Sequence, residues 1–353
     1  MKLLELHILQ TFPVSCLNRD DLNSPKTALF GGVKRARVSS QSWKRAIRQK
    51  AKEDSLEYFG GNRTLLLKDM IVAELLNIEN EVVGSDELFA SDKKQLSSSQ
   101  IKLIEKIVKK IGDKALIFLS NQEIKAIALA IKNETLKDEK NVLKVIEDAS
   151  ANDIADIALF GRMAASLEEL NMEAASMFSH ALSTNKVDND IDFFTALDDF
   201  KTENGAGYLG SNEFNSATYY RYIGVNLDLL KSNLKLPEVL SAEEELRYNA
   251  ILTSFIRASL IAVPVGKQNT MNASTLPSYV LGIVKKGQPM QLCNAFESPI
   301  RNSYENSIGE NSKKALKEHL DTMEKTWGLS SILKVELPET SLDNFIAEIL
   351  KNV

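Results

Sequence analysis

Two groups of charged residues in the sequence could bind or cut a polymer that carries phosphates. Between residues 22 and 52 there are nine Lys or Arg side chains and no Asp or Glu, although the formal net charge of the chain is −5. Further along, Asp188, Asp190 and Asp192 alternate with other residues. Unpaired cations bind phosphate groups, whereas clustered carboxylates can hold Mg²⁺ for phosphodiester hydrolysis. The first group predicts nucleic-acid binding, and the second raises the alternative of a metal-dependent endoribonuclease.

The cations of the first group would share one face of a helix. Ser39 or Ser40 could cap this helix, and no Gly or Pro follows until Gly60. At about 100° per residue, one polar sector contains Gln41, Lys44, Arg45, Arg48 and Lys52, opposite Trp43, Ala46 and Ile47. No acid lies three or four residues from the first three of these cations, and cations in the first turns oppose the helix dipole. A bound phosphate would relieve this, helped by free backbone N–H groups at the helix start; a merely solvated charged face is the alternative.

The elements that must position these groups are strands near both ends of the chain and helices between them. Residues 3–11 and 33–38 have the pattern of strands, and helical spacing dominates residues 62–182. Residues 184–216 suit a hairpin or mobile arm with the turn signal "ENGAG". Beyond it, "TYYRYIGVNLDLL" and "SYVLGIVKKG" are typical of strands, with residues 242–263 as a helix between them. This order predicts an α+β fold whose core is closed by distant segments.

Composition excludes several classes of protein. The 353 residues contain no apolar run of about 18, which predicts no membrane span. The two cysteines, Cys16 and Cys293, lie far apart without CxxC spacing, so we expect neither a disulfide framework nor a zinc site. This cysteine usage favours a reducing, cytoplasmic compartment. The three histidines are scattered, and no Walker-type or dinucleotide glycine pattern occurs. Nothing in the sequence calls for a cofactor.

The segment "SCLNRDDLNSPKTALFGGVKRARVSSQSWKRAIR" strongly resembles the amino-terminal signature of the CasC family. CasC is the repeated backbone subunit of Cascade, the type I-E CRISPR surveillance complex. The segments "DIALFGRMA" (156–164) and "HALSTNKVDNDIDFFTALDDF" (180–200) resemble the same family. The resemblance extends from the start of the chain to about residue 225, and is weaker at about residues 60–150 and beyond residue 298.

The resemblance implies a fold, a function and partners. It implies a modified RNA-recognition-motif (ferredoxin-like) core at residues 1–60 and 217–353, a large helical insertion at 61–182 and a protruding thumb hairpin at 183–216. Members of the family are non-catalytic and assemble head to tail along crRNA with other Cascade subunits, and they present the guide to target DNA. The residues that would contact RNA are Arg19, Lys26, Ser39, Gln41, Lys44, Arg45, Arg48, Met163, Phe193, Phe194, Lys267 and Gln268.

The aromatic pair of the thumb has two interpretations. Adjacent residues of a strand face opposite sides, so Phe193 and Phe194 are either core residues or a tip with one ring available. The resemblance favours a wedge between nucleotides, although Phe193 stands where family members have Trp. Stacking on a ring is blind to base sequence, as a scaffold for a variable guide requires. A free-standing single-stranded RNA-binding protein remains the other alternative to the backbone subunit.

Overall fold

The computed structural model of the chain describes residues 1–81, 96–112, 116–149, 152–164, 166–196 and 208–353. These residues form two compact units. The first contains Met1–Ala51, Ser176–Asp228 and Ser241–Val353, and the second contains Lys52–Ala175 and Leu229–Leu240. The predicted division at residues 60, 182 and 216 stays a prediction.

The first unit is built on an antiparallel sheet. Within the described residues the strand order is β11-β10-β1-β9-β7-β3-β2, and β6 and β8 each pair with β9. The strands are β1 (Lys2–Ser15), β2 (Thr27–Phe30), β3 (Val33–Val38), β6 (Ser176–Phe178), β7 (Ala181–Ser183), β8 (Asp190–Ala196), β9 (Tyr208–Asn226), β10 (Tyr279–Lys286) and β11 (Leu333–Leu337). The sheet together with the helices that cover it confirms the predicted α+β class.

Strand β1 lies inside the sheet and is buried on both faces. It pairs with β10 along residues 2–9 and with β9 along most of its length. Because side chains alternate along a strand, Leu4, Leu6 and Ile8 face one side while Glu5 and His7 face the other, and all five are buried. A strand covered on both faces carries few exposed positions, which explains the apolar start of the chain.

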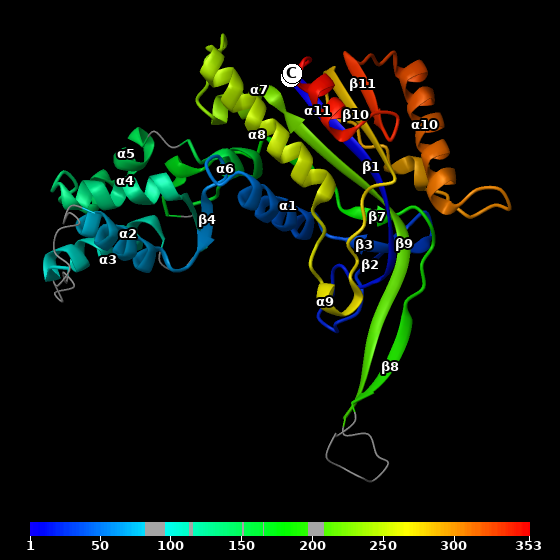
Figure 1. Cartoon of the computed structure of the whole chain (residues 1–353), viewed down its shortest axis with the longest axis horizontal. Coiled ribbons are helices and arrows are strands. Elements are labelled where there is room, and N and C mark those ends of the chain that lie inside the picture. Colours follow the sequence, from blue (N-terminus) through cyan, green and yellow to red (C-terminus); the bar gives the residue numbers. More distant parts are fainter. Residues whose placement is uncertain (82–95, 113–115, 150–151, 165, 197–207) are drawn as a thin grey trace. The chain divides into compact units, whose positions relative to one another are not determined.

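Helices of the first unit cover the two faces of this sheet (Figure 1). Helix α10 and the short η3 pack on the face that carries Leu9, Tyr220 and Tyr222, and helices α1, α8 and α11 lie on the opposite face. The bounds are α1 (Ser40–Asp54), α7 (Leu227–Asn233), α8 (Ala242–Ile261), α9 (Gln268–Met271), η3 (Cys293–Phe296), α10 (Ile308–Trp327) and α11 (Leu342–Leu350). Helices α1 and α7 each continue past the boundary of the unit.

The second unit is a helical cluster beside a two-stranded ladder of β4 and β5. Its core is aliphatic and is built from Leu, Ile and Val side chains of α2, α3, α4 and α5. Its elements are β4 (Gly61–Thr64), α2 (Leu67–Glu81), α3 (Ser98–Ile111), β5 (Ile117–Ser120), α4 (Asn121–Lys132), η1 (Glu139–Asn141), α5 (Val142–Asp148), α6 (Ala155–Phe160) and η2 (Glu168–Leu170). The predicted helical character of this region is confirmed.

Most predicted elements occur, with two differences. The segment 218–230 leaves the sheet after Asn226 and continues as α7, because Leu227 and Leu230 are both buried at helical spacing. The C-terminal elements α10, β11 and α11 were not predicted. The turn signal "ENGAG" lies outside the described residues.

Of the helices in the described parts of the chain, none is both long enough and apolar enough to cross a bilayer.

Candidate nucleic-acid interface

Helix α1 begins where the sequence predicts and docks through its apolar side. The Ser39 hydroxyl accepts a hydrogen bond from the backbone N–H of Ser42 (3.3 Å), which is the N-cap contact. Trp43 and Ile47 are buried, whereas Gln41 and Arg45 are exposed. Lys44 and Arg48 of the predicted polar sector are half-buried. The two sides of the helix therefore differ as the sequence predicts.

Burial removes some of the nine cations from the surface. Arg35 of β3 is fully buried, and burial lowers the pKa of its guanidinium. This group donates hydrogen bonds of 2.7–3.1 Å to the backbone carbonyls of Ser183, Thr184, Phe296 and Glu297. Lys52, at the far end of α1, donates to the Gly61 carbonyl and to Asn62. The positive charge of this region is therefore smaller at the surface than in the sequence, and Arg35 is a structural residue.

Lys44 lies beside an aromatic ring of the sheet. Its Nζ is 5.4 Å from the centre of the Phe178 ring in β6. This contact places the ammonium over the ring face, where the ring quadrupole attracts a cation. Lys44 is thus held at the side of α1 that faces β6.

On another side of α1, Arg19 and Arg45 line one pocket. The pocket has a volume of about 430 Å³ and is bounded by α1, residues 17–23 and residues 264–266. Its polar lining includes Asn18, Arg19, Asn23, Ser42, Arg45 and Gln49, together with one acid, Asp20. Gly266 brings two of these segments together, because a Cβ atom there would lie 2.5 Å from the Cys16 carbonyl oxygen. Two cations with amide and hydroxyl donors are groups that bind phosphate oxygens.

A third group of basic residues lies at the first turn of α1. The Nδ1 atom of His180 accepts a hydrogen bond from the backbone N–H of Ser40 (3.1 Å). Burial lowers the pKa of His180, and the nearby charges of Arg37 and Lys26 lower it further. Lys26 and Arg37 are also joined through the backbone, because the Arg37 N–H donates to the Lys26 carbonyl. The neutral imidazole therefore orders the start of a helix beside two cations.

The thumb, residues 183–216, is a two-stranded arm where it is described (Figure 1). Strand β8 pairs with β9 so that Phe193 is opposite Ser211 and Phe194 is opposite Gly210. The rings therefore lie on opposite faces, with exposed fractions of 71% for Phe193 and 39% for Phe194. Exposed Ile191 shares the face of Phe193. Phe193 is not a core residue of this chain.

Two of the three thumb acids share one face of β8, and the third is paired with a lysine. Asp188 forms an ion pair with Lys186 (3.1 Å), while Asp190 and Asp192 lie in β8 opposite Phe214 and Asn212. All three acids are exposed. No three His, Cys, Asp or Glu side chains of the described residues form a group that could hold a metal ion.

Lys267 and Gln268 lie in the segment that follows α8, and both side chains form hydrogen bonds. Lys267 has a left-handed backbone conformation (φ 48°), and its Nζ donates to the Asn212 side chain of the thumb strand β9. The Gln268 amide donates to Asn272 and Ser274. The first contact connects this segment to the thumb, within the first unit.

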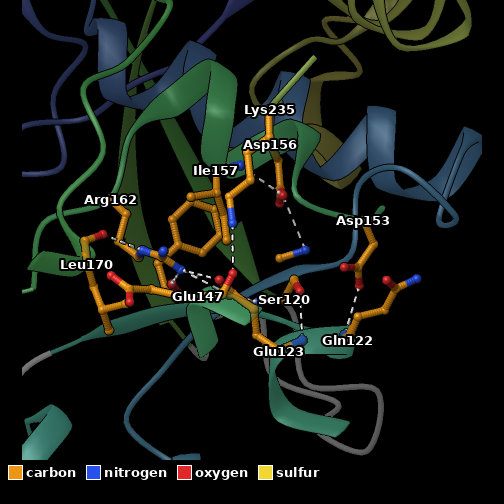
Figure 2. Close-up of polar contacts among 12 residues, drawn as sticks. Ser120, Gln122, Glu123, Glu147, Asp153, Asp156, Ile157, Arg162, Leu170 and Lys235 are labelled. Carbon is orange, nitrogen blue, oxygen red and sulfur yellow. Dashed lines mark hydrogen bonds and ion pairs between the residues drawn. The ribbon is translucent and has the colours of Figure 1, made fainter. Parts of the chain in front are cut away.

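Met163 belongs to the second unit and follows Arg162, which forms a buried ion pair with Glu123 (Figure 2). The preceding residue, Arg162, donates to both carboxylate oxygens of Glu123 (2.7 and 2.9 Å) and to the Leu170 carbonyl (2.7 Å). Glu123 also caps α4 by accepting from the Ser120 N–H. Met163 itself is 83% exposed. The structure therefore presents its thioether at the surface of the unit.

The "DIALFGRMA" segment contains a second structural contact (Figure 2). The Asp156 carboxylate is buried and accepts from the backbone N–H groups of Gly61 and Ile157. A Cβ at Gly61 would clash with this carboxylate, so only glycine fits. Asp156 and Arg162 thus both have structural roles in the folded segment.

Comparison with a family model described as "CT1975-like protein" gives a match over residues 4–346. The chain belongs to the CT1975-like protein family. No curated protein matches it. It is similar to a chain of a solved structure titled "CRISPR RNA-guided surveillance complex, pre-nicking", with 25% identity, a TM-score of 0.77 and 99% of each chain covered. A chain of a second structure, "CRISPR RNA-guided surveillance complex", shares the fold with 24% identity, a TM-score of 0.63 and the same coverage.

In this CT1975-like chain, sequence reasoning missed four residues at or near α1. Asn18 and His180 accept hydrogen bonds from the backbone at its start, Arg37 lies close to His180, and Gln49 of the helix lines the pocket. Asn18 and Arg37 are within the first quoted segment, and His180 opens the third. The signal was therefore present, but a lone histidine or asparagine has many other uses. Only the fold shows that His180 and Ser40 meet, 140 residues apart in sequence.

Proposed function

We propose that this protein is a non-catalytic, RNA-binding backbone subunit of a CRISPR Cascade complex, of the type I-E CasC kind. Support comes from the CT1975-like family and from the full-length likeness to a chain of a CRISPR RNA-guided surveillance complex. In this proposal the antiparallel sheet is the modified RNA-recognition-motif core, and the protein works in the cytoplasm.

The observation that carries the proposal is the arrangement of cations around the start of α1. Arg19 and Arg45 line a polar pocket on one side, and Lys26 and Arg37 lie at the first turn. Lys44 faces β6 on another side. Arg and Lys side chains bind phosphate oxygens, and contacts to phosphate do not depend on base sequence. Such contacts suit a scaffold that must hold many different guides.

Assembly along the guide forms the second part of the proposal. Several copies bind one crRNA head to tail, together with other Cascade subunits, and leave the guide bases available for pairing with target DNA. The exposed thumb face with Ile191 and Phe193 supports this, because an apolar arm in water is suited to inserting between nucleotides or against a neighbouring copy.

A structural role is proposed over catalysis because the thumb acids do not converge. Metal-assisted hydrolysis requires carboxylates that converge on one ion. Asp188 is paired with Lys186, and the other two acids are exposed on an open hairpin.

The test is extraction of nucleic acid from protein purified natively from its own cells. We expect short RNAs of uniform length that share a repeat-derived handle and differ in the remaining sequence. Replacing Arg19 and Arg45 together with Ala should remove most of this RNA, whereas Arg257→Ala, which breaks a surface pair with Asp343, should not. RNA of random length and origin, or equal loss in the control, would contradict the proposal.

A further inference from the structure

Arg221 is a buried cation at a junction of the first unit. It lies in β9 and is 2% exposed. One guanidinium nitrogen donates to the Gln10 side-chain oxygen (2.5 Å), and the other donates to the Ser259 carbonyl (2.6 Å). The carbon of the guanidinium is 3.6 Å from the centre of the Trp43 ring. These partners are neutral groups.

The partners are buried residues that lie next to elements of the proposed guide-binding surface. Trp43 is on the buried side of α1, opposite the exposed cations. Ser259 directly precedes the segment 260–274. Gln10 holds the far end of this segment by donating a hydrogen bond to the Thr275 carbonyl (2.6 Å). This segment carries Lys267 and Gln268. Strand β9, which contains Arg221 itself, extends into the thumb.

Burying a guanidinium in a protein core carries a desolvation penalty. Taking a cation out of water is unfavourable unless its hydrogen bonds are satisfied, and an apolar side chain would pack against α1 without this penalty. Unlike an apolar residue, arginine makes directional contacts. Its planar guanidinium donates hydrogen bonds to two acceptors in fixed positions, and its face stacks on an aromatic ring. Burial lowers the pKa of Arg221 to about 9, so the group stays charged at neutral pH.

We infer that Arg221 is a positioning residue for guide binding: it holds α1, the segment 260–274 and the thumb strand in the one arrangement in which all three reach the same RNA. The inference rests on the proposed function. It adds a residue that touches no RNA and acts through Trp43, Gln10 and Ser259.

The variant Arg221→Lys tests the inference because it keeps the charge but removes the fork. A lysine cannot donate to Gln10 and Ser259 in the same directions and stack flat on Trp43. We expect binding to poly(U), used as a sequence-blind single-stranded RNA, to weaken about tenfold, the effect of removing about one charge-assisted hydrogen bond. The slope of log K against log salt should flatten by about 0.7 for each phosphate that the variant no longer binds.

Tryptophan emission supplies a readout that is independent of RNA. The chain has two tryptophans, and Trp327 is 68% exposed at the end of α10. In a Trp327→Phe background, emission therefore reports Trp43 alone. Arg221→Lys should shift this emission to longer wavelength as α1 loosens and water reaches the indole, in protein that is still folded by circular dichroism.

Two controls separate positioning from general loss of stability. Phe345→Leu removes packing between α11 and β10 and should lower stability without changing poly(U) affinity or Trp43 emission. Arg257→Lys makes the same chemical change at the surface of α8 and should change nothing. If Arg221→Lys does not fold, Gln10→Met removes the acceptor and the Thr275 contact while Arg221 remains, and it should weaken poly(U) binding severalfold.

The outcomes are distinct. Weaker binding together with red-shifted Trp43 emission, in folded Arg221→Lys or Gln10→Met, supports the inference. Unchanged affinity and emission with lowered stability, as in Phe345→Leu, would show that Arg221 is only a core residue and would overturn the inference alone. A parent protein that does not bind poly(U) would overturn the proposed function, and the guide-binding role of Arg221 with it.

Discussion

Arg35 and Arg45 are ten positions apart and have different environments. Arg35 is buried against four backbone carbonyls, whereas Arg45 is exposed beside Arg19 in a polar pocket. Only an exposed cation can exchange its counterions for an RNA phosphate. We therefore expect Arg45 to bind RNA and Arg35 to stabilise the fold.

Arg45→Ala should weaken RNA binding equally for all guide sequences and flatten the slope of log K against log salt by about 0.7, because one phosphate is no longer bound. Lys44→Ala should act in the same way. Binding is measured by titration with poly(U) and poly(A) over a range of salt. Lys325→Ala, an exposed cation in the last turn of α10, serves as the control and should leave the slope unchanged. A loss that depends on base sequence would rule out the backbone-contact interpretation.

His7 should make stability depend on pH. Its imidazole is fully buried, with Nδ1 2.9 Å from the Tyr220 hydroxyl and Nε2 4.0 Å from the carboxylate of Glu5, which pairs with Lys285. Burial, followed by the charge of Lys285, lowers the pKa of His7 from 6.5 to about 3. Between pH 6.5 and about 3, His7 is protonated in the unfolded chain but remains neutral in the folded chain. The free energy of unfolding should therefore fall as pH decreases from about 6.5 to about 3, by up to about 1.4 kcal/mol per pH unit.

Urea unfolding at several pH values in this window measures the effect of His7. The variant His7→Gln keeps a hydrogen-bonding group near Tyr220 and does not titrate, so its stability should depend less on pH than that of the parent. Equal pH dependence in the two proteins would show that another group is responsible.

At the scale of the element, the thumb hairpin has two unlike faces. Register places Phe193 with Ile191 on one face, and Phe194 with Asp192 on the other. The more exposed ring is the better wedge, since stacking requires a free ring face.

Phe193→Ala should weaken RNA binding by about 1–3 kcal/mol, the value of one base–aromatic stack, and Phe194→Ala should weaken it less. The salt slope should stay nearly unchanged in both, because no cation is removed. Chemical probing of the bound guide should show reactive bases at regular intervals in the parent, and Phe193→Ala should alter this pattern. A pattern that persists in the double variant Phe193→Ala/Phe194→Ala would assign the rings to protein contacts.

Replacing the three thumb acids together, Asp188→Asn, Asp190→Asn and Asp192→Asn, should leave RNA intact, as in the parent. We expect this because the acids do not converge on one point. Incubation with labelled RNA and Mg²⁺, followed by gel electrophoresis, measures cleavage. Mg²⁺-dependent cutting by the parent that disappears in the triple variant would support the nuclease alternative.

At the scale of the whole molecule, the proposal predicts an assembly whose size is set by its RNA. Head-to-tail contacts that do not close form an open filament, so the bound mass should rise in steps of about one 39.2 kDa chain as the RNA is lengthened. Analytical ultracentrifugation with RNAs of increasing length measures this. Arg19→Ala/Arg45→Ala should reduce occupancy at every length. A single chain per RNA at all lengths would favour the free-standing RNA-binding protein.

Local patterns in the sequence predicted the strands at 3–11 and 33–38, the capped basic helix and the helical region correctly, because each depends on side chains a few residues apart. The same segments carried the family resemblance. The helix α7 after Asn226 was missed, since Val225, Leu227 and Leu229 alternate with polar residues as in a strand, while Leu227 and Leu230 also fit helical spacing.

Tertiary structure decided which charged residues are available and which are structural. Arg35 is removed from the surface by Phe296, 261 residues away, and Arg221 meets Gln10 across 211 residues. His180 reaches Ser40 in the same way. Burial depends on what packs against a side chain, and those partners come from distant segments that no local period encodes. The order of residues alone therefore predicted the basic helix and the resemblance of the chain to Cascade subunits, whereas the fold was needed to decide which cations of the helix face solvent and what holds the helix in place.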